Sequence, residues 1–272
     1  MEAFVLSLAL IAVGTAASLY GSLVGLGGGF IAIPILRIFF GVPTTLVAGA
    51  SIAMVTVSSL VSGVSFVRAR RVDVPLALTF ALFGIPGSIV GAGLAHMIST
   101  KWFDLAYALL IVTFAAQLIL RRRTDGDGHA HFAPFATERE FVDRDGNTWR
   151  YRVSYPVSIV FGFIVGVIAS LFGIGGGIVQ MPVMIGLFAI PPHIATATSA
   201  AAIAVVGISG TIAHMQRGDV HALYAVPLAI GGVIGGRLGP AINRRLSSPA
   251  LLKALAAALI LAAIGLAAKH IA

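Results

Sequence analysis

Long apolar stretches alternate with short polar ones along almost the whole chain. The apolar stretches cover residues 3–40, 45–67, 74–98, 102–120, 154–190, 195–215, 222–242 and 250–268. A membrane-spanning helix needs about 20 consecutive apolar residues, so most of these stretches are long enough to cross a bilayer. The pattern predicts an all-α polytopic membrane protein, with about 8–10 membrane segments at this segment length.

Two of the stretches are too long for one crossing, and each contains a glycine cluster. Residues 3–40 would form about 57 Å of helix, whereas the hydrocarbon core is about 30 Å thick. Glycine occupies four of the five positions in 25–29 and again in 173–177. Each Gly costs roughly 1 kcal/mol relative to Ala inside a helix. We therefore expect broken-helix hairpins, the first with a helix over 3–23, a break at 25–29 and a shorter helix over 30–40.

The two halves of the chain are copies of each other. GLGGGFIAIPIL at 25–36 aligns with GIGGGIVQMPVM at 173–184, and the same offset pairs Ser51 with Ser199. Further along, Arg-Val-Asp-Val at 71–74 matches Arg-Gly-Asp-Val at 217–220 after a two-residue shift. The sequence predicts a first transmembrane repeat over 1–120 and a second over 155–272, joined by a polar loop over 121–154.

Clusters of arginine predict the orientation of these repeats. Basic loops face the cytoplasm, which places 68–71 and 121–123 on the same side, two helices apart. Arg244 and Arg245 join them there only if the second repeat is inverted. The predicted fold is two inverted repeats, each a broken-helix hairpin plus three transmembrane helices.

The loop over 121–154 is the one long hydrophilic stretch, and it holds six of the ten carboxylates. Its second part alternates in polarity on both sides of Asp145-Gly146, a pattern typical of a β-hairpin. We expect strands near 139–144 and 148–153, forming a small cytoplasmic flap.

Composition narrows the function. Apolar residues make up 58% of the chain and charged residues 10%, against about 25% charged in soluble domains, which excludes a soluble globule. The net charge of +8 lies in short loop clusters and does not indicate nucleic-acid binding. Cys is absent, so thiolate metal sites and thiol catalysis are excluded. His129 and His131 are interpreted as a surface pair, and we expect no metal, no cofactor and no catalytic residues.

No carboxylate lies in the middle of a predicted membrane segment, and this favours an anion as the transported species. Asp73, Asp104 and Asp219 all lie at segment ends, and cation pumps normally need acids within the membrane. An enzyme would need a carboxylate pair, a triad or a metal centre. Anion transport is the class that remains.

The glycine breaks are the candidate anion site, because a helix N-terminus with free amides binds anions. Close helix packing is the alternative role of these glycines, and helix capping is the alternative for the nearby hydroxyls. The predicted substrate-binding residues are Gly27, Gly28, Gly29, Ser51, Gly175, Gly176, Gly177, Gln180, Thr196 and Ser199.

Some basic residues have open roles. Arg37 and Arg237 have no basic counterpart in the other repeat, and we interpret them as snorkelling to the membrane surface. The alternative is a cationic lining that attracts the anion. His96, His193, His214 and His221 are expected at membrane edges; any of them would suit a coupling proton, and the sequence does not single one out.

The duplicated glycine–proline motif resembles the two signature copies of the TauE/SafE-type sulfite exporter family, also called the toluene-sulfonate uptake permeases. The resemblance covers both halves of the chain and leaves out the loop at 121–154. It implies a transporter of small inorganic or organic sulfur oxyanions in a bacterial inner membrane, and it points to Gly25–Gly29 and Gly173–Gly177 as the duplicated motif.

We therefore expect a secondary transporter, with export the favoured direction, of sulfite, sulfoacetate or another organosulfonate by alternating access. The alternative is a non-transporting membrane scaffold that docks partners through the 121–154 loop. The expected partners are the anion and the lipid bilayer, without nucleic acid, and a homodimer stays open.

Overall fold

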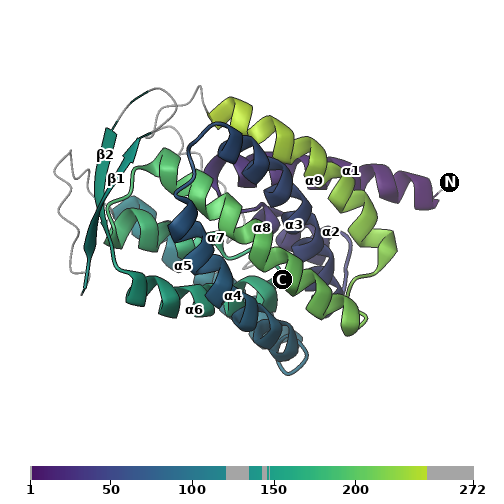
Figure 1. The fold of residues 1–272 in the computed structure, drawn as a ribbon. Helices are drawn as coiled ribbons and strands as arrows, with labels where there is room; N and C mark the ends of the chain where they lie inside the picture. The colour runs from purple at the N-terminus through teal and green to yellow at the C-terminus, as the bar shows by residue number, and fades with distance from the viewer. Residues whose placement is uncertain (1, 121–134, 143–145, 147, 244–272) are drawn as a thin grey trace.

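The computed structural model describes residues 2–120, 135–142, 146 and 148–243, most of which lie in helices (Figure 1). The elements in chain order are α1 (Glu2–Val24), α2 (Gly29–Phe39), α3 (Thr44–Arg68), α4 (Val74–Leu94), α5 (Thr100–Leu120), β1 (Thr137–Val142), β2 (Thr148–Val153), α6 (Tyr155–Phe172), α7 (Gly177–Pro182), the π-helix η1 (Val183–Leu187), α8 (Pro192–Gln216) and α9 (Ala222–Asn243).

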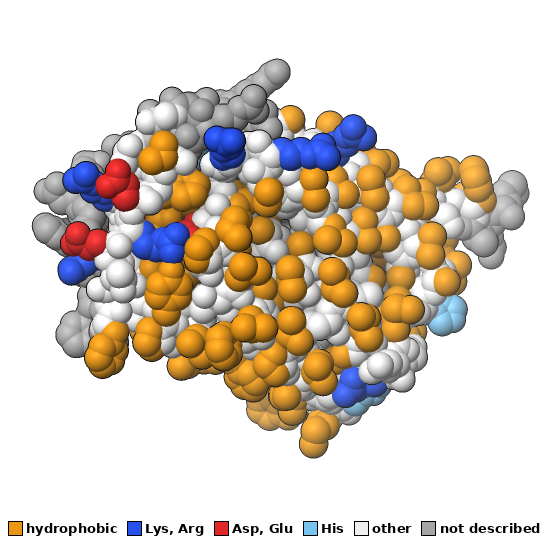
Figure 2. All heavy atoms as spheres, viewed as in Figure 1, with side chains coloured by type: hydrophobic (Ala, Val, Ile, Leu, Met, Phe, Trp, Pro, Cys, Tyr) orange, Lys and Arg blue, Asp and Glu red, His pale blue; other side chains and the backbone are white. Residues whose placement is uncertain are grey.

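Six of these helices, within the described residues, are long and apolar enough to cross a membrane: α1, α3, α4, α6, α8 and α9. Two shorter apolar helices cover Gly29–Phe39 and Gly177–Leu187. Apolar side chains spread over the face shown in Figure 2, while most of the charged ones gather towards its edges. The chain is thus a multi-pass α-helical membrane protein, as its polarity pattern predicts. The segment expected at 250–268 lies outside the described residues.

The two repeats exchange helices with each other. Helix α1 packs along α9 of the second repeat, and α6 packs along α4 of the first. Glycines allow this close approach: Gly14 lies against the backbone of Leu228, and Gly87 against that of Phe163. Small residues at such crossings bring helix backbones into van der Waals contact. Since α3 also packs on α9 and α8 on α4, two bundles form, α1–α3–α9 and α4–α6–α8, each built from both repeats.

Helices α3 and α8 join the two bundles and run in opposite directions. The hydroxyls of Thr56 and Thr211 lie 2.9 Å apart, whereas Gly63, further along α3, faces Ala200 and Ala201 near the beginning of α8. These two helices occupy equivalent places in the repeats, so their antiparallel contact has the direction that inverted repeats require. Inversion with respect to a membrane stays a prediction.

The β-hairpin forms, with a boundary that differs from the expected one. The register pairs Thr137 with Val153 and Val142 with Thr148, so β1 begins two residues before the predicted 139 and ends at 142. Two side chains of the hairpin, Tyr151 and Val153, are buried. Their side chains pack into the core, which makes one face of the hairpin part of the folded body.

Candidate functional site

Each repeat carries a break at its glycine cluster. Helix α1 ends at Val24 and α2 begins at Gly29, while α6 ends at Phe172 and α7 begins at Gly177. The residue before each short helix is left-handed, with φ 92° at Gly28 and 79° at Gly176. A side chain with a Cβ rarely adopts this conformation, so the clusters interrupt the helices as predicted.

The two breaks lie against each other. A Cβ atom added at Gly29 would lie 2.7 Å from Cα of Ile174, and one added at Gly177 would lie 2.5 Å from Cα of Leu26. Both distances are shorter than van der Waals contact, so only glycine fits at either position. The close-packing role of the glycines is therefore present in the structure, together with two buried helix N-termini that carry no side-chain cap.

Some backbone amides at the breaks are free and others are not. The amide of Gly27 donates to the carbonyl of Gly21 at 3.3 Å, so Gly27 does not offer the free donor that we expected of it. Neither α2 nor α7 has a side-chain cap. Among the described residues, the amides of Gly28, Gly29 and Gly175–Gly177 have no hydrogen-bond acceptor. These amides are the donors available to an anion.

Ser51 and Ser199 occupy equivalent positions in the two repeats, and each forms a hydrogen bond with the glycine break of the other repeat. Ser51 Oγ donates to the carbonyl oxygen of Gly173 at 2.8 Å, and Ser199 Oγ donates to that of Gly25 at 2.8 Å. Both bonds satisfy carbonyls that the helix breaks leave unpaired. In this conformation the two hydroxyls are bound to the protein, and they cap carbonyl groups rather than helix N-termini.

Gln180 has a donor without a partner. The side chain is buried, its Oε1 accepts from Ser199 Oγ at 3.3 Å, and its Nε2 has no partner among the described residues. A buried unsatisfied donor costs about 1–3 kcal/mol, which an anion oxygen would recover. Thr196 belongs to the same group, because Gly25 contacts its Cα and its Oγ1 lies 3.5 Å from the Val24 carbonyl.

Arg37 does not behave as expected from the sequence, and Arg237 differs from it. Arg37 is buried and forms a bidentate ion pair with Asp104 of α5, with Nη2–Oδ2 at 2.7 Å and Nε–Oδ1 at 3.2 Å. Snorkelling is therefore wrong for Arg37, whose charge a buried carboxylate balances. Asp104 lies near the beginning of α5, and nothing in the sequence indicates that it pairs with Arg37. Arg237 is exposed on α9.

A buried aspartate in each repeat was not predicted as a site residue. Asp73 accepts from Tyr151 Oη at 2.7 Å and pairs with Arg139 at 3.3 Å, so the hairpin is docked at the beginning of α4. Burial and the neighbouring carboxylate raise the pKa of the Tyr151 hydroxyl. The repeated Arg-x-Asp-Val motif was the one feature of the sequence that could have marked Asp73 and Asp219 as site residues.

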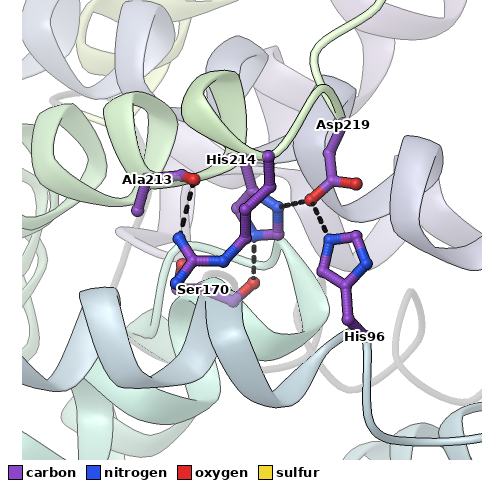
Figure 3. A network of polar contacts seen from close by, with 6 residues as sticks. His96, Ser170, Ala213, His214 and Asp219 are labelled. Carbon is purple, nitrogen blue, oxygen red and sulfur yellow. Dashed lines mark hydrogen bonds and ion pairs between the residues drawn. The ribbon is translucent and has the colours of Figure 1, made fainter.

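The second aspartate lies in a histidine network (Figure 3). Asp219 Oδ2 is 2.7 Å from Nδ1 of His214 and 2.9 Å from Nε2 of His96. His214 Nε2 lies 2.8 Å from the carbonyl oxygen of Ser170. His214 is fully buried inside the protein, although it lies in the last turn of α8. His129 and His131 lie outside the described residues.

Comparisons with known proteins agree with this architecture. Residues 10–266 match the family model described as Sulfite exporter TauE/SafE. The chain is 32% identical over 259 residues to the probable membrane transporter protein YunE of Bacillus subtilis, covering 93% of this chain and 94% of that protein. It is 25% identical to the probable membrane transporter protein MJ0441 of Methanocaldococcus jannaschii, covering 88% and 86%. No solved structure matches the chain. These matches show that the chain belongs to the TauE/SafE sulfite exporter family of membrane transporters.

Proposed function

We propose that the protein is a secondary transporter that exports a small sulfur-containing oxyanion, such as sulfite, sulfoacetate or another organosulfonate, across a bacterial inner membrane. The family name and the transporter names of the relatives support this substrate class. The observation that carries the proposal is the Nε2 of buried Gln180, which has no partner within the described part of the chain and lies beside the two apposed helix breaks.

The anion would be held by neutral donors. The free amides at Gly28, Gly29 and Gly175–Gly177 and the Gln180 amide would donate to its oxygens. Ser51, Ser199 and Thr196 would turn from carbonyl groups to the anion when it enters. Neutral donors suit a transported ion, because a buried cation pair would bind it more tightly and slow its release.

The two bundles provide the moving parts for alternating access. The glycine breaks lie where α1–α3–α9 and α4–α6–α8 meet, and each bundle contributes one break. Rocking of the bundles about the α3–α8 contact would separate the Ser51–Gly173 bond on one side or the Ser199–Gly25 bond on the other. Rigid-body rocking of repeat-derived bundles about a central site is a known mode of secondary transport.

The direct test is flux through the purified protein in proteoliposomes. Sulfite, thiosulfate and sulfoacetate would be supplied separately, and uptake compared with protein-free vesicles. Gln180→Ala should reduce the affinity for the transported anion by about 1–2 kcal/mol, roughly 5- to 30-fold in Kd, for one hydrogen bond to a charged ligand.

Thr79→Ala is the matched control, because the Thr79 hydroxyl donates within its own helix to the carbonyl of Pro75. It should leave affinity unchanged. Failure of all three anions to bind or move would refute the proposed substrate class. A scaffold that docks partners through the 121–154 loop would then be the better account.

A further inference from the structure

The network of His96, His214 and Asp219 shares no residue with the proposed anion site, and Figure 3 shows its contacts. It joins three elements: the end of α8, the loop before α9 and the turn after α4. We propose that this network binds the proton that is coupled to anion movement, an inference that rests on the proposed transport function. Histidine suits such a role because it gains and loses a proton near physiological pH.

The hydrogen-bond geometry requires a bound proton. A carbonyl oxygen can only accept, so the contact between His214 Nε2 and the Ser170 carbonyl places a hydrogen on Nε2. An ionised carboxylate also only accepts, so the Nδ1–Asp219 contact needs a second hydrogen, either on Nδ1 or on the carboxyl group. Neutral His214 beside ionised Asp219 has one hydrogen too few for both contacts.

Loss of the proton therefore breaks one of the two contacts. The neutral imidazole then keeps its hydrogen bond to only one of the two groups, Asp219 or the Ser170 carbonyl. At the remaining group, a ring nitrogen lone pair faces an oxygen lone pair, which is repulsive. Ser170 lies in the last turn of α6, three residues before Gly173, where the helix carbonyls have no intrahelical partners. Protonation is in this way linked to the position of α6 at the glycine break, which is the proposed anion site.

The equivalent aspartate of the first repeat has a different partner. Asp73 is paired with Arg139, a permanent cation, and with the Tyr151 hydroxyl. Asp219 is paired with two histidines, whose charge depends on proton binding. The partner of Asp73 is thus always charged, whereas the charge on the partners of Asp219 depends on whether they bind a proton.

The network reaches the surface of the protein at His96. The side chain of His96 is 42% exposed, while His214 is fully buried and Asp219 is 4% exposed. Both histidines contact the same carboxylate oxygen, so a proton can pass from His96 to Asp219 and on to His214. The predicted orientation places this entrance on the outer side of the membrane.

Other ionisable side chains surround the network. Arg217, from the end of α8, donates to the Ala213 carbonyl at 2.9 Å and approaches α4 at Gly93. His221 and Tyr224, at the beginning of α9, have their rings 6.2 Å apart. From α6 the network meets the Ser170 carbonyl rather than a charged group. His221 is exposed and provides a matched control.

The test follows anion and proton together. Proteoliposomes containing a pH-sensitive dye would be supplied with sulfoacetate, whose acidic groups stay ionised between pH 6 and 8, as carboxyl groups ordinarily do. The wild-type protein should move protons with sulfoacetate. His214→Gln should keep sulfoacetate binding within about threefold and lose proton movement, whereas His221→Gln should behave like the wild type.

A second measurement reports on the site without transport. If the folded network holds a proton that the unfolded chain releases, stability falls as pH rises. The thermal midpoint of the wild type should then fall as pH rises, and His214→Gln should flatten this dependence while His221→Gln retains it. His96→Gln, at the exposed end, replaces His214→Gln if the latter does not fold, and should slow proton movement.

The outcomes separate the two proposals. Proton movement that survives in both His214→Gln and Asp219→Asn, with sulfoacetate flux intact, overturns the proton site and leaves transport standing. A wild type that neither binds nor moves sulfite, thiosulfate or sulfoacetate overturns the proposed function and the coupling role with it. In that case the pH dependence of stability still shows whether the network holds a proton.

Discussion

At the scale of single residues, Gly28 and Gly176 each combine a left-handed backbone with a crowded neighbourhood. A Cβ atom at Gly28 would lie 2.7 Å from the carbonyl carbon of Ala17, and one at Gly176 would lie 2.6 Å from Cγ1 of Val165. Backbone strain and lack of space therefore act at the same positions. The two effects can be separated, because Gly41 has φ 61° and nothing within 4 Å of its added Cβ.

Gly28→Val and Gly176→Val should reduce anion binding at least tenfold, because the side chain blocks approach to the free amides and disfavours the left-handed backbone. Equilibrium binding of sulfite to detergent-purified protein measures this. Gly41→Ala carries a similar conformational strain without the crowding and should bind normally. Normal binding by both valine variants, with loss of binding in Arg237→Ala, would assign the site to the arginine instead.

The Arg37–Asp104 pair makes a different prediction, about stability. Removing one partner of a buried ion pair typically costs about 3–5 kcal/mol, whereas replacing both with apolar residues costs little. Arg37→Ala and Asp104→Ala should each lower the thermal midpoint in detergent, and Arg37→Met combined with Asp104→Leu should restore most of it. An Arg37→Ala protein with unchanged stability and lost anion binding would favour the cationic lining.

At the scale of elements, the two short helices differ although their sequences align. Pro34 lies inside the continuous helix α2, whereas α7 ends at Pro182 and continues as the π-helix Val183–Leu187. Proline removes a backbone donor and clashes with the preceding turn of the helix. Single turns of π-helix are frequent at functional sites. The second break also carries Gln180 where the first has Ala32. The proposed anion site would therefore be asymmetric, although the sequence around it is duplicated.

The hairpin is an element whose docking can be tested by pH. The raised pKa of Tyr151 keeps its hydroxyl protonated, so its contribution to stability is fully present below the ordinary tyrosine pKa of about 10 and is lost as pH rises further. Tyr151→Phe should lower the thermal midpoint at pH 8 and reduce the additional loss above pH 10. Arg150→Ala is the control, since Arg150 is 81% exposed and pairs with Glu140 on the surface. Equal effects of the two variants would contradict a docked hairpin.

At the scale of the whole molecule, the exchange of helices between repeats makes each half depend on the other. Helix α1 packs on α9 and α4 on α6, so neither repeat buries its own glycine faces alone. The antiparallel contact of α3 with α8 brings both breaks to the same place. Inversion of the repeats would then give the molecule two related conformations, facing opposite sides of the membrane.

Sidedness can be measured because the chain has no cysteine. Ser99→Cys should react with an impermeant thiol reagent from outside the cell. Thr137→Cys and Ser248→Cys should react only after the membrane is permeabilised, because inverted repeats place the hairpin and the loop at 248 inside. Labelling of Ser248→Cys in intact cells would show that the repeats are parallel.

The helical membrane fold, the two breaks, the duplication and the hairpin can all be predicted from the amino-acid sequence. Each of these depends on local properties: apolar length sets a membrane segment, clustered glycines end a helix, and turn residues between alternating strands set a hairpin. Such features act over a few residues, so they can be recognised without knowing what packs beside them.

The pairing of the polar side chains could not be predicted from the sequence and is seen only in the folded protein. Arg37 meets Asp104 across 67 residues of chain, and His96 meets Asp219 across 123. Ser51 and Ser199 are bound to the opposite break, and Gln180 Nε2 has no partner among the residues that the structure describes. The state of a buried polar group depends on its neighbours in space. Arg37 finds its neighbour far along its own repeat, whereas His96, Ser51 and Ser199 find theirs in the other repeat.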